Sequence, residues 1–165
     1  MGLGVLIPSS PGLYLLVLEL GEHFRGWVGS LGFVNLDRGF YVYLGSARGP
    51  GGLRARVLRH VGGPRRVRWH IDYLTSRPSV RCVLAVVVET VDDLEELVAA
   101  KLLNLASLKP AVKGFGSSDR RSLTHLFKCT STLQDCLGEI VTTLTQMGFK
   151  KPVVVNLHYQ LGARG

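Results

Sequence analysis

Four residues of this chain have the types and the spacing that phosphate-ester chemistry needs. Tyr14 and Tyr43 stand in the short motifs Gly12-Leu13-Tyr14 and Tyr43-Leu44-Gly45, both inside segments rich in apolar and aromatic residues. Arg56 and His60 are four residues apart, so they share one face of a predicted helix. An arginine can bind phosphate oxygens, a neutral histidine can take or relay a proton, and a tyrosine can position or deprotonate water. We therefore treat these four residues as candidate catalytic residues.

Each of the four also has a purely structural interpretation. Tyrosines in strands are often partly buried packing residues, and a single arginine is more often a solvated surface residue than a ligand-binding one. His60 could merely form a hydrogen bond to a backbone carbonyl. A tyrosine acting as a base also needs help, because its reference pKa is about 10. A cation such as Arg56, or a metal ion, would have to favour the phenolate.

Arginines are concentrated around these candidates. The chain has a formal net charge of +8, and no acidic residue lies between Arg38 and Ile71. Arginine outnumbers lysine there, which favours phosphate recognition because the planar guanidinium can bind two oxygens at once. The glycine-rich segment 46–53 could add backbone amides at the start of the helix, although a tight turn explains it equally well. The candidate nucleic-acid-binding residues are Ser46, Arg48, Arg54, Arg59, Arg65, Arg66, Arg68 and His70.

Periodicity and turn residues predict the elements that position these side chains. Strands are expected at 13–20, 25–31, 40–46, 81–88, 123–129 and 153–158, with 81–88 central and 123–129 at an edge. Helices are expected at 53–61, 69–75, 92–105 and 131–147, with Asp92 as the N-cap of the third. Together they predict one α+β domain with a central, mostly antiparallel sheet flanked by helices.

The ordered motifs resemble the GIY-YIG nuclease superfamily. The resemblance runs from Gly12 to about Phe127 and includes the segments 45–49, 51–53, 59–60, 69–74, 114–119 and 125–127. These segments look like a largely archaeal branch, some members of which are fused to endonuclease III-type glycosylases. Where that branch commonly has cysteines, this chain has Arg120, Arg121 and Ser122. The resemblance implies a nuclease domain at residues 1–130. The segment from Leu133 onward lies outside the resemblance, and residues 131–165 are predicted to be a helix and strand extension packed on the same domain.

The resemblance also implies one glutamate on a later helix that holds a divalent metal ion. Glu95 and Glu96 compete for this role in the helix predicted at 92–105. The predicted buried stripe contains Leu94, Leu97, Val98, Leu102 and Leu105. With Leu94, Val98, Leu102 and Leu105 at its centre, Glu95 lies at the border of the stripe and Glu96 nearly opposite. We therefore choose Glu95, which could equally complete a capping box with Asp92.

These observations predict a metal-dependent DNA endonuclease that uses Mg²⁺ or Mn²⁺. Its expected substrate is duplex, damaged or branched DNA, with abasic sites suggested by the repair-linked fusions, and RNA is a less favoured alternative. A non-catalytic nucleic-acid-binding module with a basic groove is the second interpretation. A hydrolase built from Ser117, Asp119 and His125 is a weaker rival, because no nucleophile-elbow pattern surrounds the serine.

The remaining composition points to a cytoplasmic protein. The apolar run at 83–88 is far shorter than the roughly 18–20 residues that cross a bilayer, so no membrane partner is expected. The chain has an odd number of cysteines, namely Cys82, Cys129 and Cys136, without a CxxC or zinc-type pattern. We predict that all three are reduced thiols, most of them buried.

Overall fold

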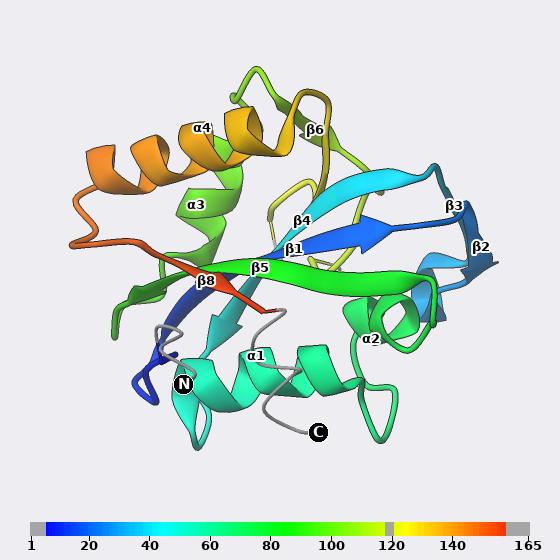
Figure 1. The fold of residues 1–165 in the computed structure, drawn as a ribbon, viewed down its shortest axis with the longest axis horizontal. Helices are drawn as coiled ribbons and strands as arrows, with labels where there is room; N and C mark the ends of the chain where they lie inside the picture. Colours follow the sequence, from blue (N-terminus) through cyan, green and yellow to red (C-terminus); the bar gives the residue numbers. More distant parts are fainter. Residues whose placement is uncertain (1–5, 118–120, 158–165) are drawn as a thin grey trace.

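A computed structural model describes residues 6–117 and 121–157 of the chain (Figure 1). Within these ranges a six-stranded antiparallel sheet has the order β6-β7-β4-β1-β5-β8, and a separate hairpin pairs β2 with β3. The strands of the large sheet are β1 Gly12–Leu20, β4 Gly39–Ala47, β5 Val80–Glu89, β6 Leu108–Pro110, β7 Leu126–Cys129 and β8 Val153–Asn156. The hairpin strands are β2 Phe24–Trp27 and β3 Phe33–Leu36, and the helices are α1 Gly52–Gly62, α2 His70–Thr75, α3 Glu95–Leu102 and α4 Leu133–Gln146.

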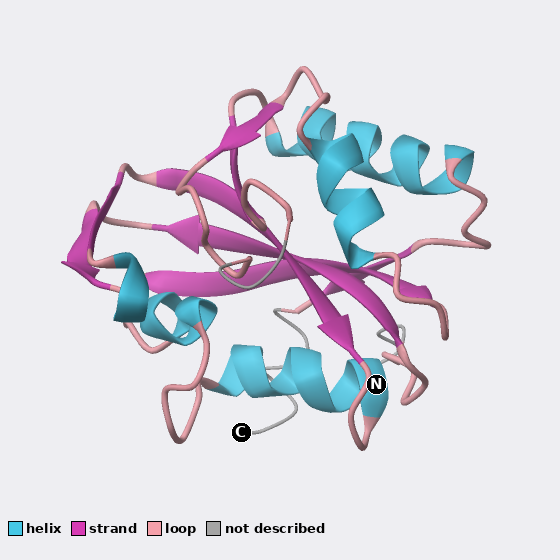
Figure 2. Ribbon diagram, turned by 180° about the vertical axis from the view of Figure 1, so that it is seen from behind, coloured by secondary structure: helices cyan, strands magenta, loops and turns pink. Residues whose placement is uncertain are grey.

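Helices cover both faces of the sheet. In Figure 1, α1 and α2 lie on one side of it and α3 and α4 on the other, and Figure 2 shows the same layers from behind. The central strand β1 serves both layers because its side chains alternate. Leu16 and Leu18 enter the cluster that contains α1 and α2, whereas Leu15 and Val17 enter the cluster that contains α3 and α4. The structure therefore confirms the predicted α+β fold with a central antiparallel sheet.

The prediction of one strand at 25–31 is wrong, because the structure has a hairpin in this region. The chain leaves β2 after Trp27, makes a 3-10 turn at Gly29–Leu31 and returns as β3. The reversal uses positive φ angles at Gly29 and Gly32, which glycine adopts at little cost. The strand pattern of 25–31 thus included the turn of a hairpin.

The helix predicted at 92–105 is shorter and is capped differently. It begins at Glu95, and Leu94 takes the N-cap position without a side-chain hydrogen bond, so the N-cap role predicted for Asp92 is wrong. Asp92 belongs to the preceding turn, where its carbonyl accepts the Leu94 amide at 3.1 Å. Leu97 is 52% exposed and does not belong to the buried stripe.

Strand β7 is shorter than the predicted segment 123–129, and it is not an edge strand. It lies between β4 and β6, and β6 is a three-residue strand that the sequence pattern did not reveal. So short an element has no periodicity of its own, and its pairing with β7 defines it.

The C-terminal part of the described chain joins the same core. Helix α4 contributes Cys136, Ile140 and Leu144 to the cluster beneath α3, and β8 pairs with β5 at the edge of the sheet. The last residue of the strand predicted at 153–158, His158, lies outside the described residues. No helix in the described ranges has both the length and the apolar character required to cross a membrane.

Two of the three cysteines are paired, which corrects the prediction of three thiols. Cys129 ends β7 and Cys136 lies in α4, and the turn between these elements brings their Cα atoms to 6.2 Å, where they form a disulfide. Cys82 is the free cysteine, and burial raises the pKa of its thiol to about 12. The residue spacing alone did not suggest this pairing.

Candidate active site

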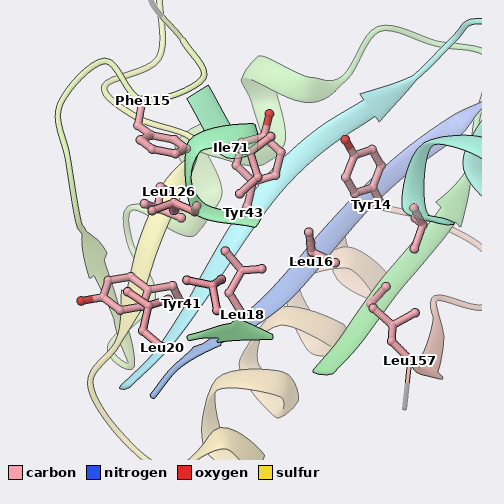
Figure 3. Close-up of a cluster of buried hydrophobic side chains, with 14 of the residues drawn as sticks. Tyr14, Leu16, Leu18, Leu20, Tyr41, Tyr43, Ile71, Phe115, Leu126 and Leu157 are labelled. Atoms are coloured by element: carbon pink, nitrogen blue, oxygen red, sulfur yellow. The ribbon is translucent and has the colours of Figure 1, made fainter. Parts of the chain in front are cut away.

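Tyr14 and Tyr43 lie on the neighbouring strands β1 and β4, on the sheet face covered by α1 and α2. Their ring centroids are 6.4 Å apart, and both side chains are buried. Figure 3 shows the two hydroxyl groups directed to the same side of the apolar cluster, whereas the hydroxyl of Tyr41 points elsewhere. The strand register therefore brings together two tyrosines that lie far apart in the sequence.

Packing of the Tyr14 ring explains the glycine of the second tyrosine motif, Gly45. Gly45 is the β4 partner of Tyr14, and a Cβ atom placed on it would overlap Cζ and the hydroxyl oxygen of the Tyr14 ring. The absence of a side chain lets the ring lie across β4. Gly45 therefore fixes the position of the Tyr14 hydroxyl.

Replacing Gly45 by alanine is expected to destabilise the fold by about 1–3 kcal/mol, because the added methyl must displace a buried ring. The change is measured as the free energy of unfolding in urea. Gly138→Ala is the matched control, since nothing lies within 4 Å of its Cβ position in α4. That control should gain about 0.5–1 kcal/mol from helix propensity. Equal effects of the two substitutions would contradict the packing of Tyr14 on Gly45.

His60 supports Tyr14 from α1. Its Nε2 atom lies 2.8 Å from the Tyr14 hydroxyl oxygen, and the histidine is 1% exposed. Its Nδ1 atom is buried and has no hydrogen-bond partner among the described residues. The imidazole is thus held against the tyrosine and can exchange a proton with it.

Burial keeps this pair neutral. It raises the pKa of Tyr14 well above its ordinary value, and the neighbouring Tyr43 acts in the same direction while Arg56 opposes it. Burial likewise raises the pKa of Tyr43. For His60, burial lowers the pKa to about 4, and the attraction of Asp72 only partly offsets this effect. At neutral pH the hydroxyls are therefore protonated and the imidazole is uncharged.

The lowered pKa of His60 predicts an acid-sensitive fold. The unfolded chain binds a proton at His60 below about pH 6.5, whereas the folded chain does so only near pH 4. Because the unfolded state binds more protons in this window, stability falls as the pH falls, by about 3 kcal/mol in total. Urea unfolding at a series of pH values should show this slope in wild type and His23→Gln, an exposed control. A similar slope in His60→Gln would contradict the assignment.

Arg56 lies one helical turn before His60 and is fixed by two contacts. Its Nη1 atom donates to the Ser46 carbonyl at 3.1 Å, and its guanidinium lies 4.5 Å from the centre of the Trp69 ring. Arg59 lies over the same ring at 4.2 Å. Cation–π stacking of this kind restricts an arginine side chain while leaving donors for a ligand. Trp69 thus positions Arg56.

These residues meet at one cavity of about 440 Å³. Tyr14, Tyr43, Arg56 and Glu95 line it, whereas His60 lies behind Tyr14. Three arginines and one carboxylate contribute to the lining, so the cavity favours an anion. Its other lining residues are Ser46, Arg48, Arg68, Trp69, His70 and Gly116.

Glu95 reaches this cavity from the first turn of α3, although Val98 and Leu102 of the same helix pack in the opposite layer. Glu96 does not line the cavity. A buried histidine, His125, lies between the two acids: its Nδ1 atom is 3.1 Å from Glu95 Oε1 and its Nε2 atom is 3.5 Å from Glu96 Oε1. Glu96 also accepts a hydrogen bond from Ser122.

The other predicted nucleic-acid-binding residues are divided between two places. Arg59, Arg65, Arg66 and Arg68 line a second cavity of about 620 Å³, and Arg68 lines both cavities. Arg59 is also paired with buried Asp72, to which it donates at 2.7 and 2.8 Å. Burial alone would raise the pKa of Asp72, but the hydrogen bonds from Arg59 and two backbone amides lower it.

The remaining candidates have local partners or lie elsewhere. Arg48 donates to the Val91 carbonyl at 2.8 Å and lies 3.7 Å from Asp93. Arg54 lines neither cavity. His70 lines the first cavity, and its Nδ1 atom accepts the Gly116 amide at 2.9 Å.

The structure does not support two alternative interpretations, namely phosphate binding by the amides at the start of α1 and a serine hydrolase site. The Gly52 amide closes a turn onto the Gly49 carbonyl, and the amides of Leu53 and Arg54 donate to the carbonyls of Ser10 and Pro8, so these three amides are not available to a phosphate. Of the hydrolase residues, Ser117 is buried, His125 contacts the two glutamates, and Asp119 lies outside the described residues.

The donor set at the cavity fits a divalent ion held mainly by water and phosphate. No group of three or more His, Cys, Asp or Glu side chains suited to a metal occurs in the described part of the chain. Mg²⁺ commonly uses one or two carboxylates, several waters and a substrate phosphate. Glu95 supplies such a carboxylate at an arginine-rich cavity, so Mg²⁺ and Mn²⁺ fit, whereas a structural zinc site does not.

Sequence reasoning assigned no role to Trp69, and it considered His125 only as part of the hydrolase alternative. The arginines that stack on Trp69 are Arg56 and Arg59, from an earlier part of the chain, so the arginines next to Trp69 in the sequence did not reveal this contact. His125 had no local signal, since its glutamate partners lie on another element.

One protein-family model matches most of the described helices and strands. No curated protein and no solved structure matches the chain. The family model described as "Domain of unknown function DUF123" matches residues 13–146, a span that includes both tyrosines, Arg56, His60, Glu95 and all of α4. The chain therefore belongs to the DUF123 domain family.

Proposed function

We propose that the chain is a metal-dependent nuclease of the GIY-YIG type that hydrolyses phosphodiester bonds in DNA. The observation that carries the proposal is the meeting of Tyr14, Tyr43, Arg56 and Glu95 at one cavity, with His60 behind Tyr14. The ordered tyrosine motifs that resemble that superfamily supply two of these side chains.

Each side chain has a chemical task in this proposal. Arg56, held by Ser46 and Trp69, binds the scissile phosphate and offsets the charge that develops as water attacks phosphorus. The Tyr14 hydroxyl orients the water. This hydroxyl accepts a proton from the water and donates its own proton to His60 Nε2, so His60 is the final proton acceptor. Tyr43 contributes a second hydroxyl on the same side of the sheet.

The leaving oxygen needs charge compensation as the phosphodiester bond breaks. A Mg²⁺ or Mn²⁺ ion held by Glu95 would supply it by polarising the phosphate or the leaving oxygen. His125 lies beside this carboxylate, with its Nδ1 atom 3.1 Å from Glu95 Oε1.

The proposal is tested by incubating the protein with end-labelled DNA duplexes that are intact, branched or abasic, together with a matched RNA. Each is incubated with Mg²⁺, Mn²⁺ or EDTA. Products that need the metal and are strongest for branched or abasic DNA are expected. The absence of products from every substrate, from a folded protein that binds them, would refute the nuclease proposal.

A non-catalytic nucleic-acid-binding module is the second candidate, and the arginine-rich lining of the cavity favours it. Because burial raises the pKa of Tyr14 and Tyr43, neither hydroxyl is ionised at neutral pH. The cavity arginines could then bind a backbone without turnover. This candidate predicts DNA binding that weakens with salt, and no metal-dependent products.

A further inference from the structure

The β2–β3 hairpin exposes two large aromatic side chains that contact each other. Trp27 is 71% exposed and Phe33 is 57% exposed. They are direct partners in the register of the hairpin, and their rings meet edge to face with centroids 5.9 Å apart. A contiguous exposed apolar surface of this kind marks an interaction site more often than an isolated exposed residue does.

The two faces of the hairpin differ in composition. Buried side chains alternate with exposed ones, as expected of a strand pair with one face on the core. The buried side chains are Phe24, Val34 and Leu36. The outward positions are Arg25, Trp27, Phe33 and Asn35, a set with one cation, one amide and no carboxylate. Such a face suits a partner with flat rings and negative charge.

The aromatic pair adjoins the turn that packs beside the candidate active site. A Cβ atom placed on Gly29 would lie 3.8 Å from His70 Cδ2 and 3.5 Å from the Tyr73 hydroxyl oxygen, so the turn contacts α2. His70 itself lines the arginine-rich cavity. Figure 1 shows the hairpin next to α2 at one end of the sheet. The two rings therefore lie on a hairpin whose turn contacts a residue of the cavity lining.

We propose that Trp27 and Phe33 form a stacking platform for unpaired nucleic-acid bases. The inference rests on the proposed function for its choice of a nucleic acid, and it names the substrate as one with a single-stranded segment beside the cleaved phosphate. Bases of an intact duplex already stack on one another, whereas unpaired bases gain a stacking partner from an exposed ring. The arginines of the cavities bind the backbone while the hairpin binds the bases.

The test measures binding in EDTA, so that cleavage does not interfere. Fluorescence anisotropy gives the Kd for a labelled single-stranded thymidine oligonucleotide and for a duplex of equal length at one salt concentration. The double variant Trp27→Ala/Phe33→Ala should bind the single strand about tenfold more weakly or worse, with little change for the duplex. The aromatic variant Trp27→Tyr/Phe33→Tyr should retain most of the affinity. Val154→Ala, an exposed apolar position on β8, is the control.

Several outcomes would overturn the platform. They are unchanged single-strand binding by the double variant, equal losses for single strand and duplex, and no single-strand binding by wild type. A dimer of wild type in sedimentation that the double variant loses would assign the rings to a second copy of the chain instead. Failure of the proposed function can be told apart from failure of the platform. If only the proposed function failed, wild type would cut no substrate, but the double variant would still lose single-strand binding and keep duplex binding.

Discussion

Replacing Arg56 by alanine is expected to lower kcat for phosphodiester cleavage by about 10²–10³-fold, the usual effect of removing one preorganised donor to a developing negative charge. The guanidinium lines the cavity, donates to the Ser46 carbonyl and stacks on Trp69. Its geometry is therefore set before substrate binds. Single-turnover cleavage of the best substrate measures the effect.

Controls separate chemistry from charge and folding. Arg56→Lys keeps the charge but loses the planar pair of donors, so it should recover only part of the activity. Arg81→Ala removes an equal charge from an exposed arginine that is paired with Glu19 on the sheet, and it should cut at nearly the wild-type rate. If Arg56→Ala, with a normal melting transition, cut as fast as Arg81→Ala, Arg56 would have no part in catalysis.

The Glu95→Gln substitution is expected to reduce metal-dependent cleavage by at least about 10³-fold, because a metal ion supplies several kcal/mol of charge stabilisation. Glutamine has nearly the same shape, so the contact with His125 and the packing of α3 should persist. The loss should remain at saturating Mg²⁺ or Mn²⁺. Cleavage rates measured across a metal titration give both the maximal rate and the metal dependence.

Glu96→Gln is the matched control for this substitution. It removes the same charge from the adjacent position, but Glu96 does not line the cavity and contacts Ser122 and the far side of His125. Glu96→Gln should therefore retain most activity. The reverse result, with Glu96→Gln inactive and Glu95→Gln active, would move the metal to Glu96.

Long elements with a clear periodicity could be predicted from the sequence. The strands predicted at 13–20, 40–46 and 81–88 and the helix at 53–61 agree with β1, β4, β5 and α1 to within one residue at each end. These segments bury an entire face or both faces, so their apolar pattern is strong. The predictions were wrong where strand pairing or a local turn determines the structure, as at the β2–β3 turn, at β6 and at the start of α3.

The candidate site was predictable to the extent that it depends on local spacing. Arg56 and His60 share a helix face because they are four residues apart. The pairing of Gly45 with Tyr14 comes instead from the antiparallel register of β1 and β4, which local spacing does not give. The partners that hold these groups were not predictable in this way. Trp69 stacks on Arg56, and His125 contacts both glutamates from another segment of the chain.

The sequence by itself therefore determined the chemical groups, the arginine-rich segment and the main strands and helix that carry them, because these depend on composition and on periodicity along the chain. Only the tertiary structure decided that His125 lies between Glu95 and Glu96, that Cys129 pairs with Cys136, and that Trp27 and Phe33 lie in contact on the surface. These outcomes depend on how strands pair and how layers pack. Such contacts join segments whose separation in the sequence carries no signal of their proximity.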